Sequence, residues 1–399
     1  MRGGYPPRIF KPKLMNFTFV STGQYPDTQA AAIRHSLLAK GLTEQGHNVS
    51  FLMLSAQEWN KKKSIDFFGV HFIELNHYKG TNKILVRYHT LQAIFKVKKI
   101  LKLQAKQKKP GALVIFTIDL LPIRFLLSSA HAMGMKVFHE RTELPYVYKA
   151  NKAVLDIYLK KYIPRFDGIF VISDKLSTYI QQFNASTQKL LTVVDLSLFS
   201  TITPSPYPFP YIGYCGTISG NKDGVPILIE AFAYISDRFP LLKLVLVGNN
   251  SNKEAIKETL DTIERFHITD KVIFTGLIER NMMPVVLCNA EILVVSKPDN
   301  EQNSGNFPIK IGEYLATGVP VVVTSVGEIP SFIKDGESGF LAVPGSAKSF
   351  AEKMEQALAN PAAAKKIGLA GKKIAADLFD YKIQARIMGD YIIKKINQQ

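Results

Sequence analysis

Short apolar runs rich in Val, Ile and Phe recur along the chain, and stretches with helical spacing of apolar residues separate them. Strand-like runs that alternate with helical patterns are typical of βαβ units and a parallel sheet. The first series predicts strands at Phe17–Ser21, Val49–Leu54, Val70–Leu75, Leu113–Phe116, Lys136–His139, Ile169–Ser173 and Leu190–Val194. The second series predicts strands at Tyr211–Cys215, Leu244–Val247, Val272–Phe274, Ile292–Val295, Val321–Thr324 and Phe340–Val343. We therefore expect an α/β protein with two doubly wound domains.

A proline-rich segment separates the two series of strands. Residues 201–210 contain four prolines, which can continue neither a helix nor a central strand, so this segment is the predicted linker. We predict an N-terminal extension over residues 1–14, a first domain over 15–203 and a second domain over 204–380. The last helical pattern, residues 381–399, is long enough to return to the first domain and complete it.

Composition narrows the class of protein. The 399 residues contain two cysteines, which cannot build a disulfide framework and have no zinc-ligand spacing, so we expect no metal. No uncharged apolar run has the roughly 18 residues of a membrane span, and the first residues lack the apolar core of a signal peptide. These observations favour a cytoplasmic protein.

The positive charge is confined to the first half of the chain. The formal net charge is +17, and residues 1–200 hold 29 Lys and Arg against 12 Asp and Glu, whereas the remaining residues hold 21 of each. Such an asymmetry indicates an anionic partner or surface. No motif typical of nucleic-acid binding accompanies the charge, so nucleic acid is not expected.

Residues 87–109 form the most basic segment. They contain eight Lys and Arg and no acidic residue, interleaved with apolar residues at helical spacing. A basic amphipathic helix can lie on an anionic membrane, and it can equally be a crossover helix with solvated lysines. Lys61–Lys63 and Lys160–Lys161 add to the same field. We expect peripheral contact with the inner face of the plasma membrane.

Two polar loops follow strands of the second series, where doubly wound sheets bind ligands. Residues 216–224 combine glycines with Lys222 before a helix, a pattern that offers backbone donors and a point charge to a diphosphate. Residues 296–322 pass through Ser304, Gly305, Asn306 and Phe307 into a short helix that contains Lys310 and Glu313. Backbone N–H groups of this loop are expected to face a phosphate or sugar, and Glu313 to accept hydrogen bonds from ribose hydroxyls.

Two further loops follow strands of the first series. Gly23, Gln24 and Tyr25 lie in the first β-to-α turn, where a glycine lets the backbone approach a ligand; the alternative is a simple turn. His139, Glu140, Arg141 and Glu143 are close together at another strand end, and burying such groups unpaired is costly. They are candidates for the acceptor side of a site, although a lone His is more often structural.

Together these motifs resemble one enzyme family. The spacing from Gly216 through Lys222, residues 244–248, residues 272–276 and residues 310–322 resembles the donor-binding domain of the GT-B glycosyltransferases of family 4. In the first half, residues 41–49 and 166–173 resemble the same family. The resemblance implies two Rossmann-like domains facing a cleft and a hexosyl-transferring enzyme of class EC 2.4 that retains anomeric configuration.

The resemblance also implies roles for individual residues. Lys222 neutralises the donor diphosphate, Gly216 and Thr217 let the backbone approach it, and Glu313 binds the ribose. Base recognition falls near Gly248 and Ile278, Lys310 is a second phosphate contact, and His139 or Glu140 lies near the transferred sugar. The donor is expected to be a UDP- or GDP-linked sugar, used without a metal or further cofactor, and the acceptor a glycan or lipid-linked saccharide in the synthesis of cell-surface polysaccharide or lipopolysaccharide.

One position departs from the family pattern. The family pairs two acidic residues eight positions apart, and Gly305 stands eight positions before Glu313. Glu301 or Asn303 are candidates to substitute for the missing carboxylate. Two alternatives follow from this fold: a sugar-nucleotide epimerase, which needs additional carboxylates in the cleft and no acceptor, and a non-catalytic nucleotide-binding partner subunit.

Overall fold

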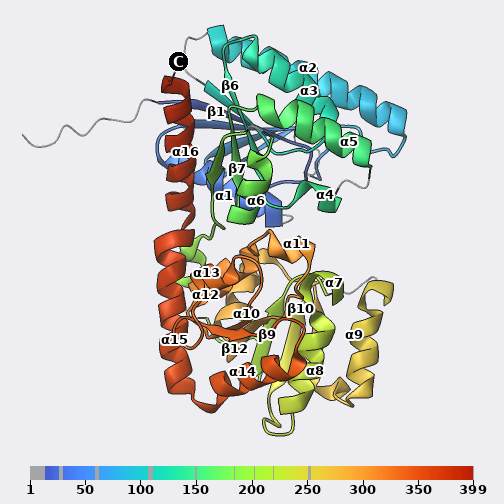
Figure 1. Ribbon diagram of the computed structural model, residues 1–399, viewed down its shortest axis with the longest axis vertical. Coiled ribbons are helices and arrows are strands. Elements are labelled where there is room, and N and C mark those ends of the chain that lie inside the picture. The colour runs from blue at the N-terminus through green and yellow to red at the C-terminus, as the bar shows by residue number, and fades with distance from the viewer. Residues whose placement is uncertain are drawn as a thin grey trace, which may run out of the picture.

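The computed structural model describes residues 14–26, 30–58, 63–106, 111–148, 151–183, 185–201, 203–218, 220–249 and 253–398. The predicted N-terminal extension, except Leu14, lies outside these residues, as do Lys61 and Lys62. Two parallel sheets are stacked end to end in Figure 1, with the segment predicted as linker between them. We refer to the units around them as the first and second domains. Their exact boundaries stay a prediction.

The first domain contains an eight-stranded sheet in the order β3-β4-β2-β1-β5-β6-β7-β8. Its strands are β1 (Asn16–Ser21), β2 (Asn48–Met53), β3 (Ser64–Phe67), β4 (Val70–Glu74), β5 (Gly111–Ile115), β6 (Lys136–Arg141), β7 (Gly168–Val171) and β8 (Thr187–Lys189). Its helices are α1 (Ala30–Glu44), α2 (Lys83–Lys106), α3 (Leu120–His131), α4 (Pro145–Tyr148), α5 (Lys152–Ile157), η1 (Tyr158–Tyr162), η2 (Ile163–Arg165) and α6 (Asp174–Gln181). All neighbouring strands are parallel except β3, which pairs antiparallel with β4.

The second domain contains a six-stranded parallel sheet in the order β11-β10-β9-β12-β13-β14. Its strands are β9 (Tyr211–Cys215), β10 (Lys243–Val247), β11 (Val272–Gly276), β12 (Ile292–Val295), β13 (Val321–Thr324) and β14 (Phe340–Ala342). The helices from Leu196 onward are η3 (Leu196–Phe199), α7 (Gly220–Asp223), α8 (Val225–Ile235), α9 (Lys253–Arg265), η4 (Thr269–Lys271), η5 (Arg280–Met282), α10 (Met283–Cys288), α11 (Glu301–Ser304), α12 (Ile309–Thr317), α13 (Ile329–Phe332), α14 (Ala347–Ala359), α15 (Pro361–Ile374), η6 (Ala375–Phe379) and α16 (Tyr381–Asn397).

Helices cover both faces of each sheet. In the first domain, α1 and α16 cover one face, and α2 and α3 cover the other. The last helix, α16, packs on α1 so closely that a Cβ atom at Gly41 would lie 2.5 Å from the Cβ of Ala385. Figure 1 shows α15 and α16 running from the second domain back to the first. The chain therefore crosses between the domains twice.

Most predicted strands are observed, with two exceptions. The segment Leu190–Val194 is not a strand: the edge strand β8 ends at Lys189, and Val194 forms only an isolated bridge with Asp380. Strand β3 is absent from the strands that the sequence predicts, because its side chains alternate between half-buried and exposed and its apolar signal is weak. Both exceptions are at the edges of the first sheet, where strands are short and burial is incomplete.

Candidate functional site

A cavity of about 640 Å³ lies between the two domains. It is lined by the start of α1 and the loop after β6 on the first-domain side. On the second-domain side it is lined by the end of β9, α7, the segment after β11, the end of β12 and the start of α12. Both sheets thus present the carboxyl ends of their strands to one cavity, which is where doubly wound folds bind ligands.

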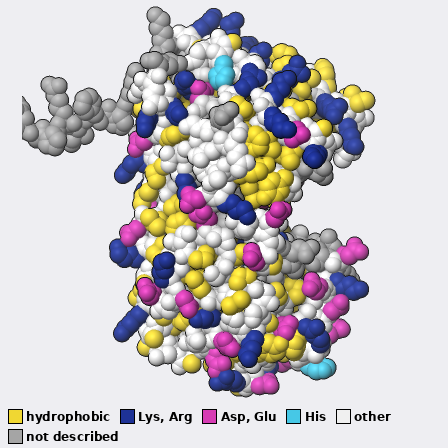
Figure 2. All heavy atoms as spheres, viewed as in Figure 1, with side chains coloured by type: hydrophobic (Ala, Val, Ile, Leu, Met, Phe, Trp, Pro, Cys, Tyr) yellow, Lys and Arg dark blue, Asp and Glu magenta, His cyan; other side chains and the backbone are white. Residues whose placement is uncertain are grey.

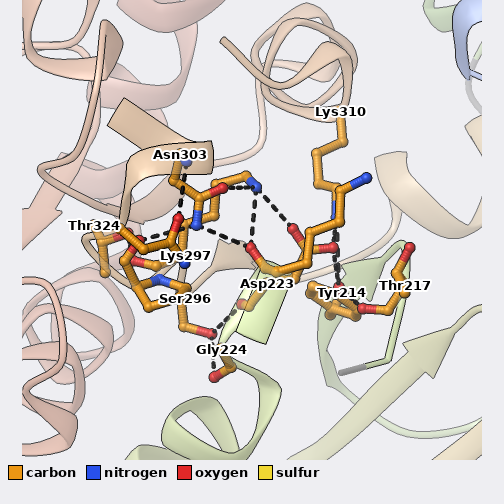
Figure 3. A network of polar contacts seen from close by, with 12 residues as sticks. Tyr214, Thr217, Asp223, Gly224, Ser296, Lys297, Asn303, Lys310 and Thr324 are labelled. Carbon is orange, nitrogen blue, oxygen red and sulfur yellow. Dashed lines mark hydrogen bonds and ion pairs between the residues drawn. The ribbon is translucent and has the colours of Figure 1, made fainter. Parts of the chain in front are cut away.

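Asp223 is at the centre of a polar network at the second-domain side of the cavity (Figure 3). It is 2% exposed, and its two carboxylate oxygens lie 3.0 Å from the ammonium of Lys297 and 2.9 Å from that of Lys310. The hydroxyl of Tyr214 donates to the same carboxylate over 3.1 Å. These residues come from α7, the end of β12, α12 and β9, so the fold assembles the network from four separate segments.

The neighbours of this network fix the segment after β12. Lys297 donates to the Asn303 side chain over 2.8 Å and to the Lys222 carbonyl over 3.2 Å. Asn303 in turn donates to the Lys222 carbonyl, and Ser296 donates to the carbonyl oxygens of Asp223 and Gly224. The hydrogen bonds of the Asn303 side chain are therefore made within the protein, whereas the Glu301 side chain is exposed on α11.

Burial and charge act in opposite directions on this cluster. Burial alone raises the pKa of Asp223, but Lys310 and Lys297 outweigh it and hold that pKa well below its usual range. Burial lowers the pKa of Lys297, and the charge of Asp223 partly offsets the decrease. Asp223 is therefore an anion at neutral pH, and Lys297 owes part of its charge to it.

Two glycines allow the backbone to pass close to Lys310. Gly216 has φ +152°, and a Cβ there would lie 2.0 Å from the Lys310 ammonium. A Cβ at Gly248 would lie 2.0 Å from the Gly216 carbonyl oxygen. The Gly216 N–H donates to Val247, so it belongs to the sheet and does not face the cavity as a donor. The neighbouring Thr217 lines the cavity and is exposed.

Glu313 lines the cavity together with Arg280. The Arg280 guanidinium donates to the Glu313 carboxylate over 3.1 Å, and both side chains keep some exposure, 32% and 15% respectively. Ile278 lines the same region. The sequence analysis missed Arg280, although its position just after β11, beside the predicted Ile278, is where a strand end meets the cavity.

The loop from Ser304 to Phe307 contacts the first domain. Lys175 donates to the Ser304 hydroxyl over 2.6 Å, and Ser173 donates to the Gly305 carbonyl over 2.7 Å. A Cβ at Gly305 would lie 2.7 Å from a methyl group of Leu144. In this arrangement of the domains, a side chain at position 305 therefore requires the Leu144 side chain to move.

The other residues of this loop have mixed environments. Asn306 and Phe307 are buried and line the cavity. Phe307 also packs edge-on against Phe332, with ring centroids 5.2 Å apart. Close by, Lys189 pairs with Glu328 over 2.6 Å and adds to the contact between the domains.

A second buried carboxylate lies in the first domain. Glu140 accepts from Arg34 over 3.0 Å and is 2.6 Å from His35. Burial raises its pKa, but Arg34 and His35 outweigh burial and lower the pKa to about 2. Arg34 also donates to the carbonyls of Leu190 and Leu191 over 3.1 and 2.5 Å, so this cluster ties α1 to the segment that leads to the linker.

Of the residues predicted after β6, Glu143 faces the cavity and His139 does not. His139 is fully buried, with one ring nitrogen 2.5 Å from the Ile115 carbonyl and the other 2.7 Å from the Tyr158 hydroxyl. Glu143 lines the cavity, and burial raises its pKa against the opposing charges of Lys222 and Arg141. The structure therefore does not bring His139 to the other candidates.

The remaining predicted residues of the first domain are engaged within it. Gln24 donates to the Ala56 carbonyl over 2.6 Å, and the Tyr25 hydroxyl is 2.6 Å from His35. Arg141 is buried and donates to the Glu143 carbonyl. Gly23, Gln24, Tyr25 and Arg141 are described in the structure, and none of them lines the cavity. No group of His, Cys, Asp and Glu in the described part of the chain has the arrangement of a metal site.

Comparison with known proteins relates the chain to glycosyltransferases. Residues 209–360 match the family model "Glycosyl transferases group 1". The capsular polysaccharide biosynthesis glycosyltransferase CapM of Staphylococcus aureus is 28% identical over 180 residues, which cover 43% of this chain and 43% of the relative. The match thus spans less than half of the length of this curated relative.

Solved structures match the whole chain. A sucrose-phosphate synthase from Thermosynechococcus elongatus superposes with a TM-score of 0.76 at 19% identity, covering 96% of this chain and all of that one. Anabaena HepE, solved with UDP and glucose, superposes with a TM-score of 0.71 at 16% identity, covering 95% of this chain and all of HepE. These matches confirm the predicted GT-B fold; assignment to family 4 stays a prediction.

Proposed function

We propose that this chain transfers a sugar from a nucleoside diphosphate to a saccharide acceptor. The proposal starts from the membership of the second domain in the group 1 glycosyltransferases. One observation supports the proposal above all: the cavity between the domains has Lys222, Lys297, Lys310 and Arg280 on its second-domain side. Cations at this place suit a departing nucleoside diphosphate, whose negative charge grows as the sugar leaves.

The donor would lie along the second domain. In this proposal, Lys222 and Lys310 contact the diphosphate, Glu313 accepts hydrogen bonds from the ribose, and Ile278 and Gly248 lie near the base. A UDP- or GDP-linked sugar fits these roles. The complex of HepE with UDP and glucose, a protein with the same fold, supports a UDP-linked donor.

The proposed reaction retains anomeric configuration. The acceptor hydroxyl oxygen forms a bond to the anomeric carbon on the face from which the diphosphate leaves, and the carbon–oxygen bond to the phosphate breaks. The hydroxyl proton passes to the leaving phosphate oxygen. This route needs no protein base, and the family resemblance supports it. From the first domain, Glu143 is placed to accept a hydrogen bond from a sugar hydroxyl in the cavity.

The acceptor is proposed to be a glycan or lipid-linked saccharide of a cell-surface polysaccharide. The name of the relative CapM supports this pathway class. In Figure 2, Lys and Arg gather over the first domain, and Asp and Glu are more frequent over the second. None of the helices in the described ranges is long and apolar enough to cross a membrane.

We also propose that α2 lies on an anionic membrane. Its outward face combines Lys99 and Lys102 with the exposed side chains of Tyr88 and Phe95. Replacing Lys98, Lys99 and Lys102 with Gln should lower sedimentation with anionic vesicles, because each basic residue near such a surface contributes about 1 kcal/mol. Unchanged sedimentation would dismiss the membrane proposal.

Thermal unfolding with UDP, GDP, ADP, CMP and their common sugar conjugates tests the donor site. A ligand at about 100 times its Kd stabilises its domain by roughly 2.7 kcal/mol, a shift of several degrees. We expect one diphosphate to stabilise the wild type and to have no such effect on Lys222→Ala, which should also lose turnover. Retained turnover in this variant would remove Lys222 from the diphosphate site.

A non-catalytic nucleotide-binding subunit is the second candidate. The observation that favours it is Gly305, which packs on Leu144 at the position where the family pattern has its first carboxylate. Nucleotide binding without sugar transfer to any acceptor in a screen would favour this candidate, whereas transfer with any saccharide acceptor would exclude it.

A further inference from the structure

We infer that Asp223 is a positioning residue that holds Lys297 and Lys310 at the floor of the cavity, and that Lys310 so held contacts the donor diphosphate. This inference rests on the proposed function, because it assigns the part of the same site that takes the diphosphate. Asp223 itself would not touch the donor.

The two lysines beside Asp223 differ in how many of their N–H donors remain available to a ligand. An ammonium group has three N–H donors. Lys297 is 2% exposed and has three acceptors within reach: Asp223, the Asn303 side chain and the Lys222 carbonyl (Figure 3). Lys310 keeps 17% exposure, is 2.9 Å from Asp223 and has only a long contact of 3.4 Å to the Tyr214 hydroxyl. Lys310 is therefore the one of the pair that can turn a donor toward a ligand.

The second-domain wall has a charge that suits a diphosphate diester. Lys222, Lys297, Lys310 and Arg280 face the two carboxylates of Asp223 and Glu313, which leaves two positive charges. A nucleotide sugar carries one negative charge on each of its two phosphates. A nucleotide sugar can thus be neutralised here without a buried excess of either sign.

A carboxylate at an anion-binding site repels the ligand, so the presence of Asp223 has to be explained by another interaction. Without it, the ammonium of Lys297 would be buried with neutral acceptors only, which is unfavourable, and it would repel Lys310. The aromatic ring of Tyr214, 4.8 Å from the Lys310 ammonium, cannot replace a charged partner. Asp223 keeps both cations charged and in place, at the cost of some repulsion toward the phosphate.

Substitution of Asp223 separates positioning from simple Coulomb attraction, because the two predict opposite signs. In Asp223→Asn the wall gains one positive charge, so Coulomb attraction alone predicts tighter diphosphate binding. Positioning predicts weaker binding. We expect isothermal titration with UDP, GDP and ADP, compared with UMP, GMP and AMP, to show a loss of about tenfold or more for the diphosphate that binds the wild type. A smaller loss is expected for its monophosphate. Tighter diphosphate binding by the variant would overturn the inference.

A pH profile gives a readout that a purely structural role would not change. The charged groups around Lys297 are Asp223, Lys310, Lys222 and Glu143. Of these, Asp223 is the carboxylate paired with Lys297, and its removal lowers the pKa of Lys297 further. Diphosphate affinity of Asp223→Asn should therefore fall as the pH rises from about 7 to 9, more steeply than that of the wild type. Identical profiles would contradict the inference.

Lys310→Met provides a second test that spares the buried ion pair between Asp223 and Lys297. We expect it to unfold at a lower temperature than the wild type, because the buried Asp223 carboxylate loses one of its two cations, and to lose about tenfold in diphosphate affinity in the folded state. Lys373→Met is the matched control, because Lys373 is exposed, pairs with Asp377 on the surface and does not line the cavity. It should bind as the wild type does.

The outcomes distinguish this inference from the proposed function. If the wild type binds no nucleoside diphosphate, the proposed donor class is wrong and the inference is wrong with it. If the wild type binds a diphosphate and Lys310→Met binds it equally well, the donor class stands and only the inference is wrong.

Discussion

Two buried carboxylates, Glu140 in the first domain and Asp223 in the second, have nearly the same surroundings. Glu140 is near the carboxyl end of β6 and Asp223 is at the end of α7, and each lies between two nitrogen-containing side chains. In each case the neighbouring cations outweigh burial and lower the pKa of the carboxyl. Judged by burial, charge and pKa alone, the two clusters would be assigned the same role.

The difference lies in the remaining donors of the cations. Around Glu140, Arg34 gives both terminal nitrogens to the carbonyls of Leu190 and Leu191, and His35 contacts Tyr25. Around Asp223, Lys310 stays partly exposed in the cavity. A perturbed pKa therefore marks both a structural joint and a candidate ligand site, and only the free donors separate them.

The largest expected effect is on the stability of the first domain. Glu140→Gln leaves the guanidinium of Arg34 buried without its anion, and breaking one side of a buried ion pair costs about 3–5 kcal/mol. Calorimetric unfolding should show this loss in the first domain, while nucleotide binding at a temperature below unfolding stays near that of the wild type. An unchanged unfolding temperature, or a loss of nucleotide binding in the folded variant, would contradict the structural role of the Glu140 cluster.

Asp66→Asn serves as the control for that variant. Asp66 and its partner His71 are both largely exposed, and exposed ion pairs contribute little to stability. It should unfold as the wild type does.

The second effect is the dependence of stability on acid. Glu140 has a pKa of about 2 in the folded protein against an ordinary 4.5, so its ion pairs contribute fully above about pH 4.5. As the pH falls from 4.5 toward 2, this contribution, on the order of 3 kcal/mol, is lost. Unfolding temperature measured across this range should decrease less steeply in Glu140→Gln than in the wild type. Parallel curves would show that Glu140 is not responsible for the acid sensitivity.

The sequence predicts the strong elements of the fold and misses the weak ones. Five of the six strands of the second domain are mostly buried, and β11 is half-buried; the apolar runs of all six identify them. The edge strands β3 and β8 have half-exposed residues and no continuous apolar run. At Leu190–Val194 the residues Leu190, Val193 and Val194 are buried, and burial alone does not distinguish a strand from an extended segment.

The candidate site is less predictable than the fold, because ion pairs form across segments far apart in the sequence. Lys222, Lys310 and Glu313 were recognised from their loops, and all three line the cavity. No sequence motif predicts Asp223, Lys297 or Arg280, because each pairs with a residue on another element and the pair forms only in the folded chain. The place of His139 near a strand end predicts a site residue, yet its side chain is buried inside the first domain, between the Ile115 carbonyl and the Tyr158 hydroxyl.

Glu313 and Arg280 form a third carboxylate–cation pair, and both side chains line the cavity. We expect this pair to contact a ligand and to contribute little to stability, unlike the buried cluster around Glu140. Glu313→Ala should therefore leave the unfolding temperature nearly unchanged and weaken nucleotide binding about tenfold or more, since a hydrogen bond to a charged group contributes about 1.5–3 kcal/mol. Titration with a nucleoside diphosphate and with its 2′-deoxy analogue measures this: the wild type should prefer the ribose form, and the variant should bind both alike. A preference for ribose that survives in Glu313→Ala would move the ribose contact elsewhere and reduce Glu313 to a partner of Arg280.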